Sequence, residues 1–548
     1  MIKKLIILGI VILLPFCSAQ SQNSDFDLGK TLEVQSTILR LLNTQYVDTL
    51  KLDDLLTDGI RSMLSSLDPY TVFISEEEED NIEMLTTGAY GGVGAIIRKV
   101  PSGGIMVSEV YENTPAVKYG IEPGDTIIKI GDDSTFDKDV TTCSQLMRGR
   151  PGSKIPMTII KGRGGDTITV DLERERIHVS DVAYYGFVDD TTGYILLGGF
   201  TLRGSEDVKK AYMELNKSGH LKRLVLDLRG NGGGLMSEAV DILSLFLPKG
   251  TLVVSAKGKH PESNFEYRTQ KAPIDTTIPL MVMVNSASAS SSEIVAGAIQ
   301  DLDRGVIAGE RTYGKGLVQS IRSTGYNTSL KLTTAKYYTP SGRCVQAIDY
   351  SHKSDDGSVG NFPDSLRNEF RTSSGRIVYD GGGIAPDLEV PSIQYSRPII
   401  GLVYSDVLGE YAVEYYKHHE EIEPADRFHL TDAEYEDFVQ YASAIDFDSR
   451  SMAYIEMQEV LRQAQKEGLL DENKQLKETL ENALAALSES KEEFLINNKA
   501  LICPLLEDEI VLKYFYTRGG AESALRTDEQ LHQALKSWSV TDVLTNKN

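Results

Sequence analysis

The chain is poor in cysteine, histidine and tryptophan, and this scarcity excludes several kinds of site. Its 548 residues include four cysteines, eight histidines and one tryptophan. If Cys17 is removed with a leader peptide, the remaining Cys143, Cys344 and Cys503 are too few and too scattered for a disulfide framework. None of them has a cysteine or histidine at metal-ligand spacing, so the sequence predicts no metal site and no cofactor.

Positive charge is also scarce. The chain has 56 Lys and Arg against 80 Asp and Glu, a formal net charge of −24. Nucleic acids are bound by clustered Lys and Arg, so this balance disfavours them as partners. Apolar residues make up 41% of the chain and charged residues 25%, which is typical of globular proteins. At about 150 residues per domain, the length predicts roughly three to four domains.

The long apolar run at the N-terminus predicts export. Two lysines precede Leu5–Phe16, and small residues follow it up to Ala19. This pattern is typical of a secretory signal peptide, which we place at 1–19. The run is shorter than the ~20 residues that span a bilayer. Lipidation at Cys17 stays open as the one route to a membrane, although Pro15–Phe16 fits a lipobox poorly. The expected location is the periplasm or cell envelope.

Apolar spacing and glycine content then divide the mature chain. Leucines and isoleucines recur at helical spacing up to Asp68–Pro69, after which glycines separate short apolar stretches. The strands expected in that glycine-rich part lie at 104–107, 126–130, 156–160 and 167–170. We therefore predict an N-terminal helical segment over 20–87 and a compact β-rich domain over 88–176.

Near-continuous apolar runs follow, and they are typical of strands buried on both faces of a sheet. The expected strands lie at 194–197, 224–228 and 280–284, and helical patterns follow two of them at 235–247 and 291–302. This alternation indicates an α/β core over 177–392. Beyond it, the Glu-, Lys-, Leu- and Ala-rich stretch 452–499 predicts long helices in a bundle, within a C-terminal helical domain over 393–548 whose role the sequence does not give.

A serine cluster lies between one of these strands and the helix after it, over Asn285–Glu293. One interpretation is a serine-rich helix N-cap. The other is a nucleophilic serine at a strand-to-helix turn, where helix N–H groups stabilise a developing anion.

A nucleophilic serine needs a base. No G-x-S-x-G elbow occurs, and no histidine lies in a setting that suggests a base, although spacing alone does not exclude a Ser-His-Asp triad. Lys315 lies between two glycines, and burial disfavours a lysine's ammonium form, so its neutral amine could accept the proton of a serine. A strand over 317–321 would place Lys315, Leu317 and Gln319 on one face, where the Gln319 amide could hold the amine.

Two glycine-rich stretches resemble nucleotide loops only in part. Residues 309–316 match the first seven places of a Walker A loop, but Gly316 replaces the Ser or Thr that holds magnesium, and a strand-like stretch follows instead of a helix. The loop at 227–235 has G-x-G-x-G spacing rather than the G-x-G-x-x-G of dinucleotide sites. It is either an oxyanion loop or a plain loop leading into a helix.

In order along the chain, these segments resemble the C-terminal processing peptidases, exported serine proteases with a Ser-Lys pair. The matching stretches are 67–70, 288–298, 309–319, 331–333, 337–343 and 383–387. The resemblance implies a spiral α/β core like crotonases and Clp-type proteases. It implies Ser290 as nucleophile, Lys315 as base 25 residues later, and Gln319 as the orienting residue. The oxyanion donors it implies are the backbone N–H groups of Gly233 and of Ser291, where the family usually has Ala.

The β-rich domain resembles a PDZ domain inserted before the core. Residues 90–95 match its carboxylate-binding loop, which implies that the backbone of Gly92, Val93 and Gly94 binds a chain's C-terminal carboxylate. The implied partners are protein or peptide substrates, presented by their C-terminal tails. A homo-oligomer or an adaptor also stays open.

Two alternatives come from other functional classes. One is a catalytically silent PDZ scaffold or adaptor of the cell envelope, and the intact Ser290, Lys315 and Gln319 argue against it. The other is an acyl-CoA enzyme that shares the core fold, and the export signal argues against that.

Overall fold

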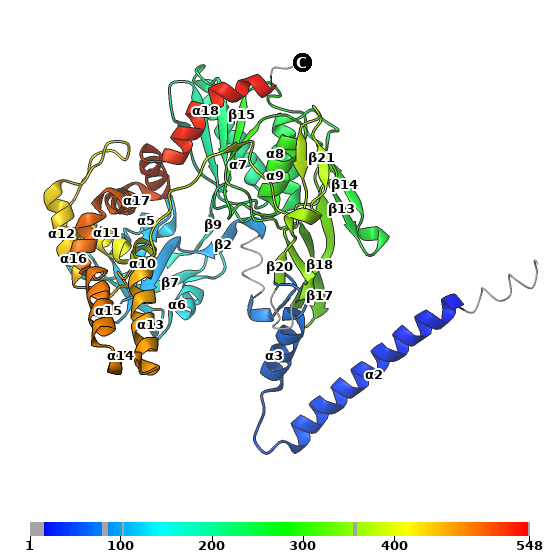
Figure 1. Cartoon of the computed structure of the whole chain (residues 1–548), viewed down its shortest axis with the longest axis horizontal. Coiled ribbons are helices and arrows are strands. Elements are labelled where there is room, and N and C mark those ends of the chain that lie inside the picture. The colour runs from blue at the N-terminus through cyan, green and yellow to red at the C-terminus, as the bar shows by residue number, and fades with distance from the viewer. Residues whose placement is uncertain (1–15, 79–85, 101–102, 354–358, 546–548) are drawn as a thin grey trace, which may run out of the picture. The chain divides into compact units, whose positions relative to one another are not determined.

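The computed structural model describes residues 16–78, 86–100, 103–353 and 359–545 (Figure 1). Most of the predicted leader, 1–19, lies outside these residues. The chain forms two compact units, one made of 1–79 with 319–333 and the other of 80–318 with 334–548. No helix among the described residues is long and apolar enough to cross a membrane.

The smaller unit combines two helices with a small sheet. Its elements are α2 (Phe16–Gln45), α3 (Leu52–Ser65), β1 (Val72–Ile74), the 3-10 turn η1 (Glu76–Glu78) and most of β17 (Leu317–Gly325) and β18 (Thr328–Tyr338). β1 pairs antiparallel with β18, Val72 opposite Lys331. The helical spacing that ends at Asp68–Pro69 is matched by α2 and α3, while the 20–87 bounds of the predicted segment stay a prediction. The Asp68 carboxylate accepts the backbone N–H groups of Tyr70 and Thr71, both at 2.8 Å, and turns the chain into a strand.

The β-rich region is an antiparallel sheet in the order β3-β4-β5-β7-β8, and the short strand β6 pairs with β5. Its elements are β2 (Ala89–Gly92), β3 (Ala95–Lys99), β4 (Ile105–Val110), α5 (Pro115–Lys118), β5 (Thr126–Ile130), β6 (Asp133–Ser134), α6 (Val140–Met147), β7 (Lys154–Ile160), β8 (Thr167–Glu173) and β9 (Glu175–His178). The four predicted strands are confirmed. Ile105, Ile127 and Met157, from three of these strands, are fully buried in the core of the sheet.

The core sheet has the order β10-β11-β12-β15-β16-β23, parallel except for the edge strand β10. Its elements are β10 (Val182–Phe187), β11 (Thr192–Leu197), α7 (Gly204–Lys217), β12 (Arg223–Asp227), α8 (Met236–Phe246), β15 (Leu280–Val284), α9 (Ser291–Asp301), β16 (Val306–Gly309) and β23 (Leu388–Glu389). The three predicted strands and two predicted helices are confirmed. Every residue of β15 is buried, as expected for a strand with both faces covered.

Further strands and turns lie outside this sheet. They are β13 (Leu252–Gly258), η2 (Pro261–Ser263), β14 (Phe265–Arg268), β19 (Ile348–Lys353), β20 (Val359–Asn361), η3 (Asp364–Leu366), β21 (Glu369–Arg371) and β22 (Ile377–Tyr379). β13 pairs with β14 and with the end of β18, where Ala256 lies opposite Tyr337.

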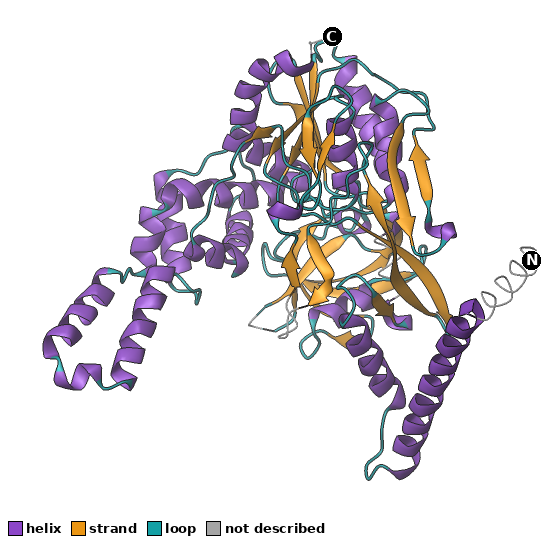
Figure 2. Cartoon of the chain, turned by 45° about the vertical axis from the view of Figure 1, so that its right-hand side comes forward, coloured by secondary structure: helices purple, strands orange, loops and turns teal. Residues whose placement is uncertain are grey.

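From residue 397 to the end of the described chain, the structure is helical (Figure 2). The helices are α10 (Arg397–Tyr404), α11 (Val407–His418), α12 (Asp432–Ser443), α13 (Met452–Lys466), α14 (Leu469–Glu472), α15 (Lys474–Ala486), α16 (Lys491–Asn497), α17 (Lys499–Arg526) and α18 (Glu529–Thr545). The bundle is confirmed. The stretch 452–499 forms several shorter helices instead of long ones, because Asn473 and Ser490 cap new helices within it.

Candidate functional site

Ser290 lies at the sharp turn between β15 and α9. Its φ of 56° and ψ of −112° lie outside the regions that L-residues prefer, which costs about 1–3 kcal/mol and marks a backbone held by its surroundings. The residue is half-buried, and α9 begins at Ser291 directly after it.

The other serines of the cluster are largely committed to structural hydrogen bonds. The hydroxyls of Ser288, Ser291 and Ser292 donate to the carbonyls of Leu228, Gly234 and Asn231 at 2.7, 2.9 and 2.8 Å. These bonds attach the glycine-rich loop over 227–234, called the glycine loop below, to the start of α9. Among the described residues, no such bond to a loop carbonyl is found for the exposed Ser286 or for Ser290, whose side chain forms a capping box with Glu293.

The glycine loop passes directly beside Ser290. A Cβ atom on Gly233 would lie 2.8 Å from the Ser290 Cβ and 3.0 Å from the Ser291 nitrogen, and Gly233 has a φ of 101°, so glycine is required there. The Gly233 N–H donates to Asn231 Oδ1 at 2.9 Å. To meet an oxyanion it would have to turn away from that side chain.

The chain around Lys315 is held by a single buried carboxylate. Glu293, in the first turn of α9, is 0% exposed. Its Oε1 accepts the Thr312 hydroxyl at 2.6 Å and the Gly314 N–H at 2.7 Å. Its Oε2 accepts the N–H groups of Ser290 and Lys315 at 2.9 and 2.8 Å. Burial raises the pKa of this carboxyl, and the four hydrogen bonds oppose that rise.

Glu293 therefore joins the backbones of the two predicted catalytic residues. Its place in the sequence predicts only a capping or first-turn role for Glu293. Its position three residues after Ser290 was the one available signal, because its other partners lie in a distant segment. The contact of Tyr337 with the site was also not predicted from the sequence. Its buried hydroxyl donates to the Ser290 carbonyl at 3.2 Å.

Lys315 is half-buried between two glycines that the packing requires. A Cβ atom on Gly314 would lie 2.3 Å from the Ala347 Cβ. Gly316 donates its N–H to Gln346 Oε1 at 2.8 Å, and its carbonyl accepts the Tyr337 N–H at 2.9 Å. Strand β17 follows, so 309–316 lacks the helix that a Walker A loop needs.

Gln319 lies on β17, within the smaller unit. Its amide donates to Thr333 Oγ1 at 3.2 Å, and that hydroxyl donates to Asp68 Oδ1 at 3.3 Å. The amide thus belongs to a hydrogen-bonded chain that ends at the Asp68 turn. A hydrogen bond from Gln319 to the Lys315 amine stays a prediction.

A groove of about 220 Å³ lies between β3 and α6. Gly92, Val93 and Gly94 line it. The rest of its lining is mainly apolar, with Ala95, Ile96, Ile97, Tyr111, Val140 and Met147, beside Tyr90, Ser144 and Arg148. Val140, Ser144 and Met147 are spaced to share one face of α6. An extended peptide laid along β3 would contact that face.

Metal ligands are not gathered anywhere in the described part of the chain. No group of three or more His, Cys, Asp and Glu residues in the described ranges could hold a metal ion. The described site thus consists of hydroxyl, amine, amide and carboxylate groups.

Three family profiles match the chain. "Peptidase family S41" matches residues 191–352, "PDZ domain" matches 76–173, and "Probable PDZ-protease, C-terminal helical domain" matches 399–537. Ser290 and Lys315 both lie within the first match, and the groove beside α6 lies within the second.

The chain is also similar to known proteins. The chain is 34% identical over 329 residues to a "Carboxy-terminal-processing protease" of Bartonella bacilliformis, which covers 60% of this chain and 75% of that protein. It is 32% identical over 314 residues to a "Probable CtpA-like serine protease" of Staphylococcus aureus, covering 56% of this chain and 61% of that protein. A solved structure named photosystem II D1 C-terminal processing protease is 26% identical over 65% of this chain and 86% of that one, with a TM-score of 0.34. The chain belongs to the carboxy-terminal-processing proteases, serine peptidases of family S41 with a PDZ domain.

Proposed function

We propose that Ser290 is the nucleophile and Lys315 the general base of this peptidase. The neutral Lys315 amine accepts the Ser290 hydroxyl proton while Oγ attacks the peptide carbonyl. The ammonium then gives that proton to the departing amine, and an ester on Ser290 remains. Water, deprotonated by the same amine, hydrolyses the ester and releases the new C-terminus.

The observation that carries this proposal is the buried Glu293 carboxylate. One of its oxygens accepts the N–H groups of both Ser290 and Lys315, so the two residues share a single fixed anchor. Catalysis by a positioned base depends on such fixed geometry. The commitment of the neighbouring hydroxyls to the glycine loop supports Ser290 as the reactive serine.

The proposed oxyanion donors are the N–H groups of Ser291 and Gly233. Ser291 is the first residue of α9, where helix N–H groups lack intrahelical acceptors. Gly233 would have to exchange Asn231 Oδ1 for the substrate oxygen. Its flanking glycines, Gly232 and Gly234, give the backbone the freedom that such a turn requires.

Digestion of unfolded casein tests the proposal. The purified protein is expected to produce fragments, and Ser290→Ala to produce none, because the variant lacks the attacking oxygen. Ser286→Ala, in the same cluster but exposed, serves as the matched control and should digest casein at the wild-type rate. Digestion by Ser290→Ala would refute the assignment. Tight binding of coenzyme A by an inactive wild type would instead favour the acyl-CoA alternative.

We further propose that the groove beside α6 binds the C-terminal tail of a protein substrate. Its lining favours apolar side chains near the end of that tail. Val140→Asp is expected to weaken binding at least ~10-fold, about 1.4 kcal/mol, because it places a charge in an apolar lining. Fluorescence polarisation of a labelled peptide with an apolar C-terminus measures this. The same peptide with an amidated C-terminus is the control, and it should bind weakly to both proteins. Equal binding of the free-acid peptide by wild type and Val140→Asp would contradict the proposal.

Export and assembly complete the proposed function. The leader over 1–19 supports action in the periplasm or cell envelope, and a mature N-terminus at Gln20, measured by mass spectrometry, would establish the cleavage. Lipidation at Cys17, a homo-oligomer and an adaptor stay predictions. A silent scaffold is not favoured, since the chain belongs to a peptidase family.

A further inference from the structure

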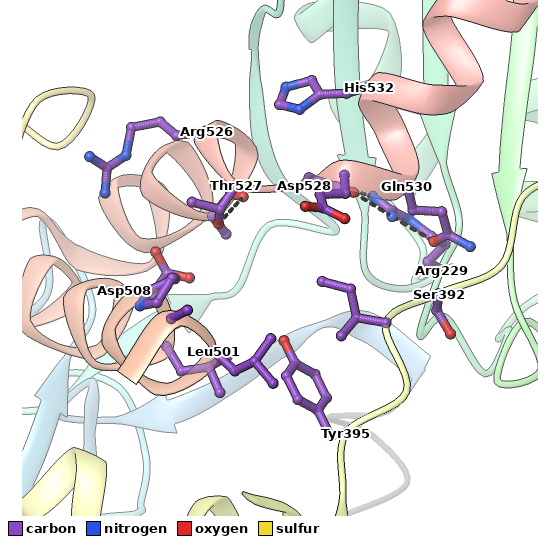
Figure 3. Close-up of a pocket in the computed structure, with 16 residues that line it drawn as sticks. Arg229, Ser392, Tyr395, Leu501, Asp508, Arg526, Thr527, Asp528, Gln530 and His532 are labelled. Atoms are coloured by element: carbon purple, nitrogen blue, oxygen red, sulfur yellow. Dashed lines mark hydrogen bonds and ion pairs between the residues drawn. The ribbon is translucent and has the colours of Figure 1, made fainter. Parts of the chain in front are cut away.

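The C-terminal helices contact the loop over 227–234 through Arg229. Arg229 follows the end of β12 and lies four residues before Gly233. Its guanidinium pairs with Asp227 on one side and with Asp528, from the C-terminal region, on the other. It also donates to Gln530 Oε1 at 2.9 Å. Figure 3 shows Asp528 and Gln530 facing Arg229 at the edge of a cavity of about 660 Å³.

These three charges are largely withdrawn from solvent. The side chains of Arg229 and Asp528 are 17% and 16% exposed, and that of Asp227 is 1% exposed. Asp227 also accepts the buried Tyr194 hydroxyl at 2.7 Å. Because the pairs are only slightly exposed, they are screened less than surface ion pairs, and removing one carboxylate leaves the guanidinium partly uncompensated.

Asp528 itself is held firmly. It precedes α18 and caps it, because its Oδ1 accepts the Leu531 N–H at 2.8 Å. The neighbouring Gln530 amide donates to the Val390 carbonyl, directly after β23, at 2.6 Å. The start of α18 is therefore held on the core sheet independently of its contact with Arg229.

The rest of the C-terminal region is anchored on the PDZ domain. Arg163 donates to the Tyr416 carbonyl at 2.7 Å, and its guanidinium lies 4.0 Å from the Tyr416 ring centroid. Tyr516 packs against the PDZ core where α17 loses helical geometry. The helices that present Asp528 are thus supported at two places.

We propose that Asp528 is a positioning residue for the loop over 227–234, acting through Arg229. This role rests on the proposed function of Ser290 and its oxyanion donors. The loop lies against Ser290 at Gly233, and oxyanion stabilisation depends on donors placed to within fractions of an ångström. The C-terminal helical region is in this account part of the catalytic unit and not a separate appendage.

Asp528→Asn tests the proposal, since asparagine caps a helix as well as aspartate but carries no charge. With a short peptide substrate, kcat is expected to fall roughly 10- to 100-fold while KM stays within about twofold. Asp528→Glu should recover part of the loss. The control is Glu410→Gln, which removes a carboxylate of similar exposure from the Arg98 pair at the PDZ domain, and its kcat should equal that of the wild type.

Hydrogen exchange supplies a readout that is independent of activity. Amides in 228–234 should exchange faster in Asp528→Asn than in wild type. Their exchange rates should be unchanged in Glu410→Gln. An Asp528→Asn protein with wild-type kcat and wild-type exchange in this loop would overturn the proposal while leaving the catalytic assignment intact. A wild type without peptidase activity would overturn the catalytic assignment, and exchange alone would then decide the role of Asp528 in holding the loop.

Discussion

Lys315→Arg is expected to abolish peptide cleavage, with a loss in kcat on the order of 10⁴-fold or more. Arginine resembles lysine in its flexible stem and is slightly longer, but it carries a permanent positive charge. It does not release its proton near neutral pH, so it cannot accept the proton of Ser290. A fluorogenic peptide assay measures the loss, and circular dichroism checks that the variant is folded.

The matched control is Lys336→Arg, an exposed lysine on β18. It should retain the wild-type kcat. If Lys315→Arg kept more than about a tenth of the activity, Lys315 would serve as a fixed charge and not as the base, and the mechanism above would be wrong.

Glu293→Gln is expected to impair both stability and catalysis. The carboxylate accepts four hydrogen bonds, and glutamine would turn its amide nitrogen toward two of those donors. Leaving two buried donors unsatisfied costs about 2–4 kcal/mol of unfolding free energy. Urea unfolding measures that cost. Misplacement of Ser290 and Lys315 should lower kcat roughly 100-fold under conditions where the variant is still folded.

Glu310→Gln is the control for that experiment. Glu310 accepts the N–H and hydroxyl of Ser392, which lies outside the proposed site. It should leave kcat unchanged. A Glu293→Gln variant that is destabilised but retains the wild-type kcat would show that the shared anchor has only a structural role.

Local patterns predicted much of the core. The apolar run 280–284 and the helical pattern 291–302 lie next to each other in sequence, and their burial follows from their own residues. Asp68–Pro69 marks the end of the helical spacing in the sequence, but the apolar spacing does not show that the Asp68 carboxylate captures the backbone N–H groups of Tyr70 and Thr71.

The contacts that organise the site could not be predicted in this way. Glu293 binds Thr312 and Gly314 across separations of 19 and 21 residues. Arg229 meets Asp528 across 299 residues. A carboxylate beside a helix start has the same local pattern whether it caps that helix or joins two distant segments, so only the folded chain distinguishes them.

The most direct measurement is the location of the acyl group during turnover. An activated peptide ester is mixed with the enzyme, quenched in acid within the first turnovers, and the protein is digested and mapped by mass spectrometry. The account predicts an acyl group on Ser290, absent from Ser290→Ala and greatly reduced in Lys315→Arg. An acyl group on Ser286, Ser288, Ser291 or Ser292, or an undiminished one on Ser290 in Lys315→Arg, would contradict it.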